Sequence, residues 1–203
     1  MSSHLIHKIA DWHTDPSKDD IPLQLRSFLK QVVEPLDLII TTKPYRDEES
    51  AEYGATILSI EDKSILFRVA KTTPTKIGQF VTVWKRSPIS GKIIPIDFND
   101  GFDFVFVASF DENNRGVFIL NKEILLKKKI YSKDGKKGKL AFRVYAPWVD
   151  TIVPQAKSTQ KWMCKYFLSL NDNFPRKNES QLSFERELNV HSPLETFKYL
   201  FNK

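Results

Sequence analysis

A chain of 203 residues is long enough to fold as one domain around a sizeable hydrophobic core. Its hydrophobic fraction of 41% and its aromatic fraction of 12% exclude an intrinsically disordered protein. The 31 Lys and Arg residues exceed the 25 Asp and Glu residues, and the resulting net charge of +6 permits a nucleic-acid or membrane-surface partner without requiring one.

The composition favours a cytoplasmic protein. Cys164 is the single cysteine, so no disulfide can form within the chain, as is usual in a reducing compartment. The amino-terminal segment contains neither the apolar core nor the cleavage site of a secretory signal. No window is long and apolar enough to span a membrane, so we expect no membrane partner.

The first predicted element, after a polar arm at residues 1–20, is a helix. Apolar residues at helical spacing begin after Ile21, and Pro35 is expected to end the helix. These apolar residues are Leu25, Phe28, Leu29 and Val32. Residues 36–42 are expected to be extended, and the acidic stretch 44–52 is expected to form another helical turn.

The middle of the chain predicts strands. Residues 55–60 and 64–70 have the pattern of a hairpin, and residues 79–86 are rich in β-branched and aromatic residues. Residues 93–96 predict an edge strand, because their proline cannot donate to a central ladder. Residues 102–110 are apolar on both faces, which is typical of a strand buried between two layers.

Strands and helices alternate in the second half. A return strand at residues 117–120 leads to Asn121, a suitable N-cap for a helix over residues 122–130. The lysine-rich stretch 127–139 follows, and its two glycines indicate a mobile, solvated loop. The remaining predicted elements are a strand at 141–145, a helix at 154–170, an irregular stretch at 171–189, and a helix that opens at Ser192 with a capping box and ends at Phe201.

This order of elements predicts an α/β (α+β) fold. The centre of the chain gives strand, strand, strand, helix and strand, with helices before and after it. Such an order is typical of a mixed sheet covered by helices. The chain contains no internal repeat and no linker-like segment. We therefore expect one domain over residues 21–203, preceded by the arm at residues 1–20.

Positive charge gathers in residues 67–86. This block contains no acidic residue and five cations: Arg68, Lys71, Lys76, Lys85 and Arg86. Because cations that share space repel one another, such a block usually meets an external anion, most often phosphate. A turn at residues 73–76 is predicted to bind one phosphate through its backbone amides and Thr75, while Lys76 neutralises the charge.

Aromatic side chains accompany these cations. Arg143 on the strand at 141–145 and the nearby Trp148 offer a planar cation and a ring face, and both can stack on bases. For Trp84 and Trp162, by contrast, we expect packing in the core. The predicted partner is therefore DNA or another polyanion.

Three segments resemble the MepB family of bacterial proteins: TPTKIGQFVTVWKR at 73–86, FRVYAPW at 142–148 and QAKSTQKW at 155–162. The similarity extends from about Tyr53 to Phe167. It implies a restriction-endonuclease-like mixed sheet, with an α-β-β-β-α-β core and flanking helices. Ala146, Met163 and Leu120 depart from the usual family pattern without threatening this fold. The family name refers to an operon with a multidrug efflux pump, so it implies neither a transporter nor a peptidase.

A restriction-type nuclease needs two carboxylates that hold Mg²⁺ and a lysine that positions the attacking water. Asp103 is the candidate metal ligand and Lys122 the candidate lysine, at the ends of two predicted strands. The position two before Lys122 should be acidic but is Leu120, so the site is incomplete unless Glu49 or Glu52 supplies a carboxylate. We prefer an ordinary strand-end role for Asp103.

The sequence thus predicts a DNA-binding protein with a restriction-endonuclease-like fold and a degenerate nuclease site. Two alternatives stay open. The first is an active nuclease, with Mg²⁺ as its cofactor. The second is a non-enzymatic protein that binds a small anionic or aromatic ligand and is linked to drug response, as the operon association implies.

Overall fold

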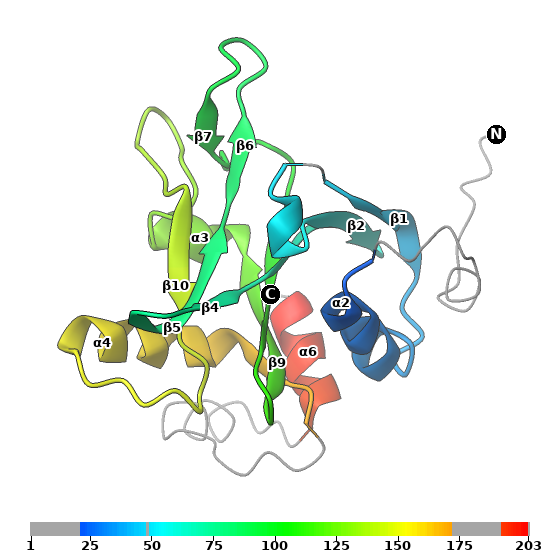
Figure 1. Ribbon diagram of the computed structural model, residues 1–203. Coiled ribbons are helices and arrows are strands. Elements are labelled where there is room, and N and C mark those ends of the chain that lie inside the picture. Colours follow the sequence, from blue (N-terminus) through cyan, green and yellow to red (C-terminus); the bar gives the residue numbers. More distant parts are fainter. Residues whose placement is uncertain (1–20, 48, 172–191, 203) are drawn as a thin grey trace, which may run out of the picture.

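The computed structural model describes residues 21–47, 49–171 and 192–202 (Figure 1). The predicted arm at residues 1–20 and most of the predicted irregular stretch at 171–189 lie outside the described residues. The described chain forms a mixed sheet with helices on one face and a smaller β-layer with further helices on the other. The predicted mixed α/β class is therefore confirmed.

Six strands form the principal sheet, in the spatial order β1-β2-β3-β8-β9-β11. Their bounds are Ile40–Arg46 (β1), Thr56–Ile60 (β2), Lys63–Val69 (β3), Phe104–Phe110 (β8), Arg115–Asn121 (β9) and Phe167–Ser169 (β11). Neighbouring strands are antiparallel except β3 and β8, which are parallel. Parallel neighbours need a long crossover connection, and residues 70–103 supply it here.

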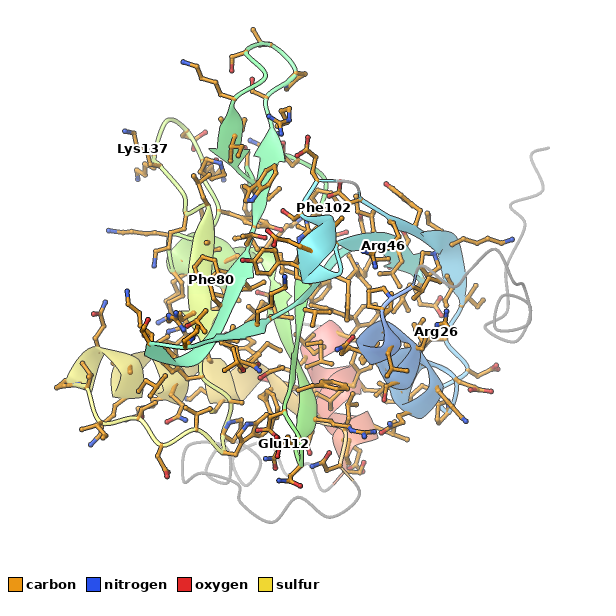
Figure 2. The ribbon with its side chains drawn as sticks, in the orientation of Figure 1. Arg26, Arg46, Phe80, Phe102, Glu112 and Lys137 are labelled. Atoms are coloured by element: carbon orange, nitrogen blue, oxygen red, sulfur yellow. The ribbon has the colours of Figure 1, made fainter. Side chains whose placement is uncertain are left out.

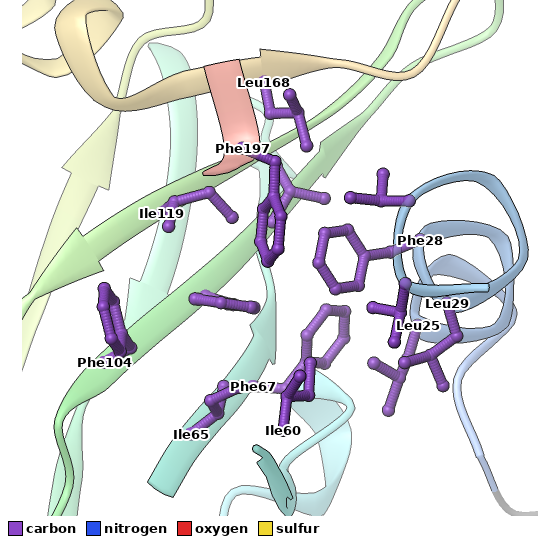
Figure 3. Packing of buried hydrophobic residues seen from close by; sticks show 14 of the residues in the cluster. Leu25, Phe28, Leu29, Ile60, Ile65, Phe67, Phe104, Ile119, Leu168 and Phe197 are labelled. Carbon is purple, nitrogen blue, oxygen red and sulfur yellow. The ribbon is translucent and has the colours of Figure 1, made fainter. Parts of the chain in front are cut away.

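The first face of this sheet is covered by helices from both ends of the described chain. They are α2 (Leu23–Phe28) with the π-helical turn η2 (Leu29–Val33), and α6 (Pro193–Phe201). Figure 3 shows Phe28 of α2 beside Phe197 of α6, and their ring centroids are 5.5 Å apart. Phe106 of β8 packs between these helices, 5.4 Å from the Phe28 centroid. These phenylalanine contacts lie within the larger of the two hydrophobic cores.

The second face is covered by smaller elements. These are the three-stranded sheet β10-β5-β4, the hairpin of β6 and β7, and the helices α3 and α4. Their bounds are Lys71–Thr73 (β4), Lys76–Thr82 (β5), Trp84–Arg86 (β6), Ile93–Pro95 (β7), Lys122–Lys127 (α3), Ala141–Val144 (β10) and Pro154–Met163 (α4). Val105 and Val107 of β8 face this layer, whereas Phe104 and Phe106 face the helices. The predicted burial of this strand on both faces is confirmed.

Both predicted helix caps are present. The Asn121 side chain accepts a hydrogen bond from the Ile124 amide at 3.0 Å, which opens α3. Ser192 and Glu195 form a reciprocal capping box at the start of α6. Local sequence was sufficient here, because a cap depends on residues only three positions apart.

The structure corrects three predicted elements. The helix expected over residues 154–170 ends at Met163, and a 3-10 turn, η4 (Cys164–Tyr166), leads into β11. The strand expected over 79–86 is divided at Val83, with β5 pairing with β10 before it and β6 pairing with β7 after it. The start of the acidic stretch 44–52 belongs to β1. Among the described residues of this stretch, the helical turn is limited to the beginning of η3 (Ala51–Tyr53).

Candidate functional site

Arg68 does not present its charge to solvent. Its side chain is 0% exposed, and its Nη2 lies 3.3 Å from Asp47 Oδ2. Its Nη1 donates to the Phe67 carbonyl at 3.0 Å. Burial lowers the pKa of Arg68 to about 10, and nearby Asp47 acts in the opposite direction, so the guanidinium stays charged at neutral pH. Arg68 is therefore a buried ion-pair residue.

Three further cations of the block meet carboxylates from outside it. The pairs are Lys71 with Glu52 (3.4 Å), Arg86 with Glu49 (2.6 Å), and Lys85 with Asp100. The hydrogen bond between Arg86 and Glu49 lowers the pKa of Glu49 and raises that of Arg86. The expectation that these cations lack carboxylate partners is therefore wrong for Arg68, Lys71, Lys85 and Arg86. Their partners come from segments 15 to 37 residues away.

Asp103 and Lys122 form an ion pair where β8 begins and β9 ends. Lys122 Nζ lies 3.1 Å from Asp103 Oδ1, and Asp103 Oδ2 accepts from the Ser64 amide at 3.0 Å. Both carboxylate oxygens thus have partners within the protein. The described residues contain no group of three His, Cys, Asp or Glu side chains placed to hold a metal ion. Glu49 and Glu52, the suggested sources of a second carboxylate, pair instead with block cations.

Trp148 packs in the core layer. It is half-buried, and its ring meets Phe167 edge to face with centroids 5.4 Å apart. It does not line the groove between the small β-sheet and α4. Trp84 lies in β6, where its ring centroid is 6.0 Å from the guanidinium carbon of Arg86.

A groove of about 880 Å³ opens between the small β-sheet and α4. One wall consists of the turn between β4 and β5, the strand β10 and the residues that follow α3. The other wall consists of Ile152, Val153 and the adjoining face of α4. Figure 1 shows α4 running beside β5 and β10, which brings these distant segments together.

All the charge on the groove lining is positive. Four cations line it: Lys76, Lys128, Lys139 and Arg143. Among the described residues, no Asp or Glu belongs to this lining. No ion pair joins any of the four to a carboxylate within the described ranges. The uncompensated charge that the sequence predicted for the whole block is thus concentrated here.

Arg143 anchors the turn that carries Lys76. Its Nη2 donates to Thr73 Oγ1 at 2.6 Å, and its Nη1 lies 3.1 Å from the Gly78 carbonyl oxygen. These partners are uncharged, so the guanidinium keeps its full positive charge while holding the turn in place. Thr75, within this turn, is exposed and lines the groove, as does Lys76.

The sequence interpretation missed three groove residues. Lys128 and Lys139 belong to the stretch predicted as a solvated loop, and Trp162 was expected in the core. Lys128 Nζ lies 4.8 Å from the Trp162 ring centroid, a cation–π contact. The available signal was the near absence of acids from residues 127–139, but only folding brings this stretch beside α4.

No helix in the described ranges is long and apolar enough to cross a bilayer. The single cysteine, Cys164, is buried in the core, as expected of a structural thiol.

The chain was compared with known proteins. No curated protein matches it. A solved structure described as the crystal structure of MepB is 34% identical in sequence, with a TM-score of 0.63, and the match covers 65% of this chain and 88% of that one. The restriction-endonuclease-like character of the fold stays a prediction. A sequence model described as MepB-like matches residues 47–169, which is more than half of the chain. Together with the shared mixed fold, this match shows that the chain belongs to the MepB-like family.

Proposed function

We propose that this protein binds nucleic acid, and DNA in particular, through the groove between the small β-sheet and α4. The observation that carries the proposal is the distribution of charge. Cations elsewhere in the basic block have carboxylate partners, whereas Lys76, Lys128, Lys139 and Arg143 surround a concave surface without any. A polyanion is the partner that such a surface attracts most strongly.

The lysine-rich loop between α3 and β10 enlarges this positive surface. Residues 133–139 contain four lysines and one acid, Asp134. Figure 2 shows Lys137 on this loop, on the outside of the molecule. Hydrogen bonds between Ser132 and residues 96–98 fix the start of the loop. Its exposed lysines would add contacts to phosphates without reading sequence.

Catalysis is not part of the proposal. Asp103 and Lys122 form an ion pair through one carboxylate oxygen, and the second Asp103 oxygen accepts a hydrogen bond from a backbone amide. Leu120, at the position where a nuclease carries an acid, is fully buried in the second core layer. These contacts support a structural strand-end pair, which needs no metal ion.

A small amphipathic anion is the second candidate ligand. The groove volume of about 880 Å³ falls within the range of small-molecule sites, about 300–1,000 Å³. Its aromatic and aliphatic lining favours this alternative. A thermal shift with small anionic aromatic compounds, and none with DNA, would support it over the first proposal.

The test of DNA binding is its dependence on salt. Four phosphate contacts predict that the association constant falls roughly 100-fold between 50 and 200 mM salt, through counterion release. Replacing Lys76, Lys128 and Lys139 together by Gln is expected to weaken binding and to reduce the slope of log K against log salt by about 3. Fluorescence anisotropy with a labelled oligonucleotide measures both quantities.

Lys71→Gln provides the matched control, because it removes a lysine that already pairs with Glu52. We expect it to change the DNA affinity much less than the groove variants do. A larger effect of Lys71→Gln than of the groove variants would place the binding surface around Lys71 and not in the groove. Binding that does not change with salt would contradict the proposal itself.

A further inference from the structure

Given the nucleic-acid binding proposed above, we infer that the groove accepts a single strand in preference to a duplex. The two walls of the groove differ in chemistry. All four lining cations belong to the β-sheet wall and the residues after α3. The wall formed by Ile152, Val153 and α4 contributes no charged residue to the lining.

The uncharged wall is mostly apolar, with Gln155 and Thr159 as its polar side chains, and it is open to solvent. The Ile152 and Val153 side chains are 81% and 56% exposed, and the half-buried Trp162 ring lies further along the same wall. Single exposed aliphatic residues are common on protein surfaces, but these two line the same groove as four cations. Such a wall needs a ligand with an apolar face of its own.

A single strand has two edges that match these walls. Its phosphates carry all the negative charge along one edge, and its unpaired bases expose apolar faces along the other. In a duplex the base faces are stacked inside, and the surface nearest a protein is largely sugar and phosphate. A duplex would place phosphates or sugars against Ile152 and Val153, on a wall that has no cation and whose few polar side chains are uncharged.

Trp162 and Lys128 connect the two walls. The ammonium group of Lys128 lies 4.8 Å from the centre of the Trp162 ring. A base stacked near the indole would therefore have a cation within reach of its own phosphate. This pairing of a ring with a cation is the arrangement by which proteins bind single strands without reading their sequence.

The inference can be tested with three labelled ligands of equal length. They are a thymidine single strand, the corresponding duplex, and an abasic strand that retains the phosphates but lacks the bases. We expect the single strand to bind at least about tenfold more tightly than the abasic strand, from the stacking of one or two bases. The duplex is expected to bind like the abasic strand or more weakly.

The double variant Ile152→Ser, Val153→Ser tests the apolar wall. Both side chains are exposed, so the fold is expected to tolerate the change. The variant should lose most of the preference for the single strand and keep its affinity for the abasic strand. Ile89→Ser is the matched control, because Ile89 is 97% exposed and lies outside the groove.

The outcomes separate this inference from the proposed function. Equal affinity for all three ligands would overturn the single-strand inference and leave polyanion binding intact, and so would a preference for the duplex. Salt-dependent binding to none of the three would overturn both.

Discussion

At the scale of single residues, burial decides what each charged side chain can do. Arg68 is fully enclosed on β3, and Asp47 is its only carboxylate partner within the described residues. A buried guanidinium without a counter-charge would keep its desolvation cost and lose the compensating attraction. The pair is therefore expected to be structural, although Arg68 belongs to the basic block.

Asp47→Ala is predicted to reduce the free energy of unfolding by about 3 kcal/mol, because it leaves the buried charge of Arg68 unpaired. Chemical denaturation measures this change. Combining it with Arg68→Met should recover much of the loss, since an apolar side chain of similar length needs no partner. An unchanged stability in Asp47→Ala would mean that Arg68 reaches water.

At the scale of elements, a glycine allows the segment after α4 to join the principal sheet as β11. Phe167 and Leu168 in β11 pair with β9, whose Gly116 lies directly against them. A Cβ atom at Gly116 would lie 2.1 Å from Phe167 Cζ and 2.6 Å from the Leu168 carbonyl oxygen. The two strands can therefore approach only because residue 116 has no side chain. This contact gives the sheet its sixth strand.

Gly116→Ala is accordingly predicted to destabilise the protein by about 2 kcal/mol or more, as overpacking of a core does. Protection of the β11 amides against hydrogen exchange should fall with it. Phe167→Leu in the Gly116→Ala background should restore only part of the stability, because the clash with the Leu168 carbonyl remains. A fully stable Gly116→Ala would indicate that β11 is loosely paired.

At the scale of the whole molecule, the two faces of the principal sheet have separate roles. The face covered by α2 and α6 is a phenylalanine-rich core, joined through Phe106. The other face supports the small β-sheet, α3 and α4, and so it positions the groove. The parallel pairing of β3 and β8 permits this division, because the crossover between them carries β4 to β7 to the second face.

Phe106→Ala should reveal how strongly these layers are coupled. We predict a loss of about 3–5 kcal/mol, because the ring contacts both covering helices and leaves a cavity when removed. Circular dichroism and tryptophan fluorescence should report one shared unfolding transition, since Trp148 and Trp162 lie in the other layer. Two separated transitions would show that the layers unfold independently. Phe106→Leu should cost less, because it leaves a smaller cavity.

Much of this architecture follows from local sequence patterns. Alternating or continuous apolar runs identified the strands of the hairpin and the buried β8, and the caps at Asn121 and Ser192 identified two helix starts. The motifs at 73–86, 142–148 and 155–162 identified the family. These features depend on residues close in sequence, so their physical causes are present before the chain folds.

Only the tertiary structure decided which cations have partners. Arg86 meets Glu49 from 37 residues away, whereas Lys139 lines the groove and forms no ion pair with a carboxylate of the described residues. Neither outcome can be predicted from a local sequence pattern, because electrostatic pairing depends on the distance between charges in the folded structure. The same reason explains the missed role of Trp162, which became a groove residue when α4 packed beside β10. The sequence by itself determined most of the central strands, the two helix caps, the family and the excess of positive charge. Folding determined where that charge stays uncompensated.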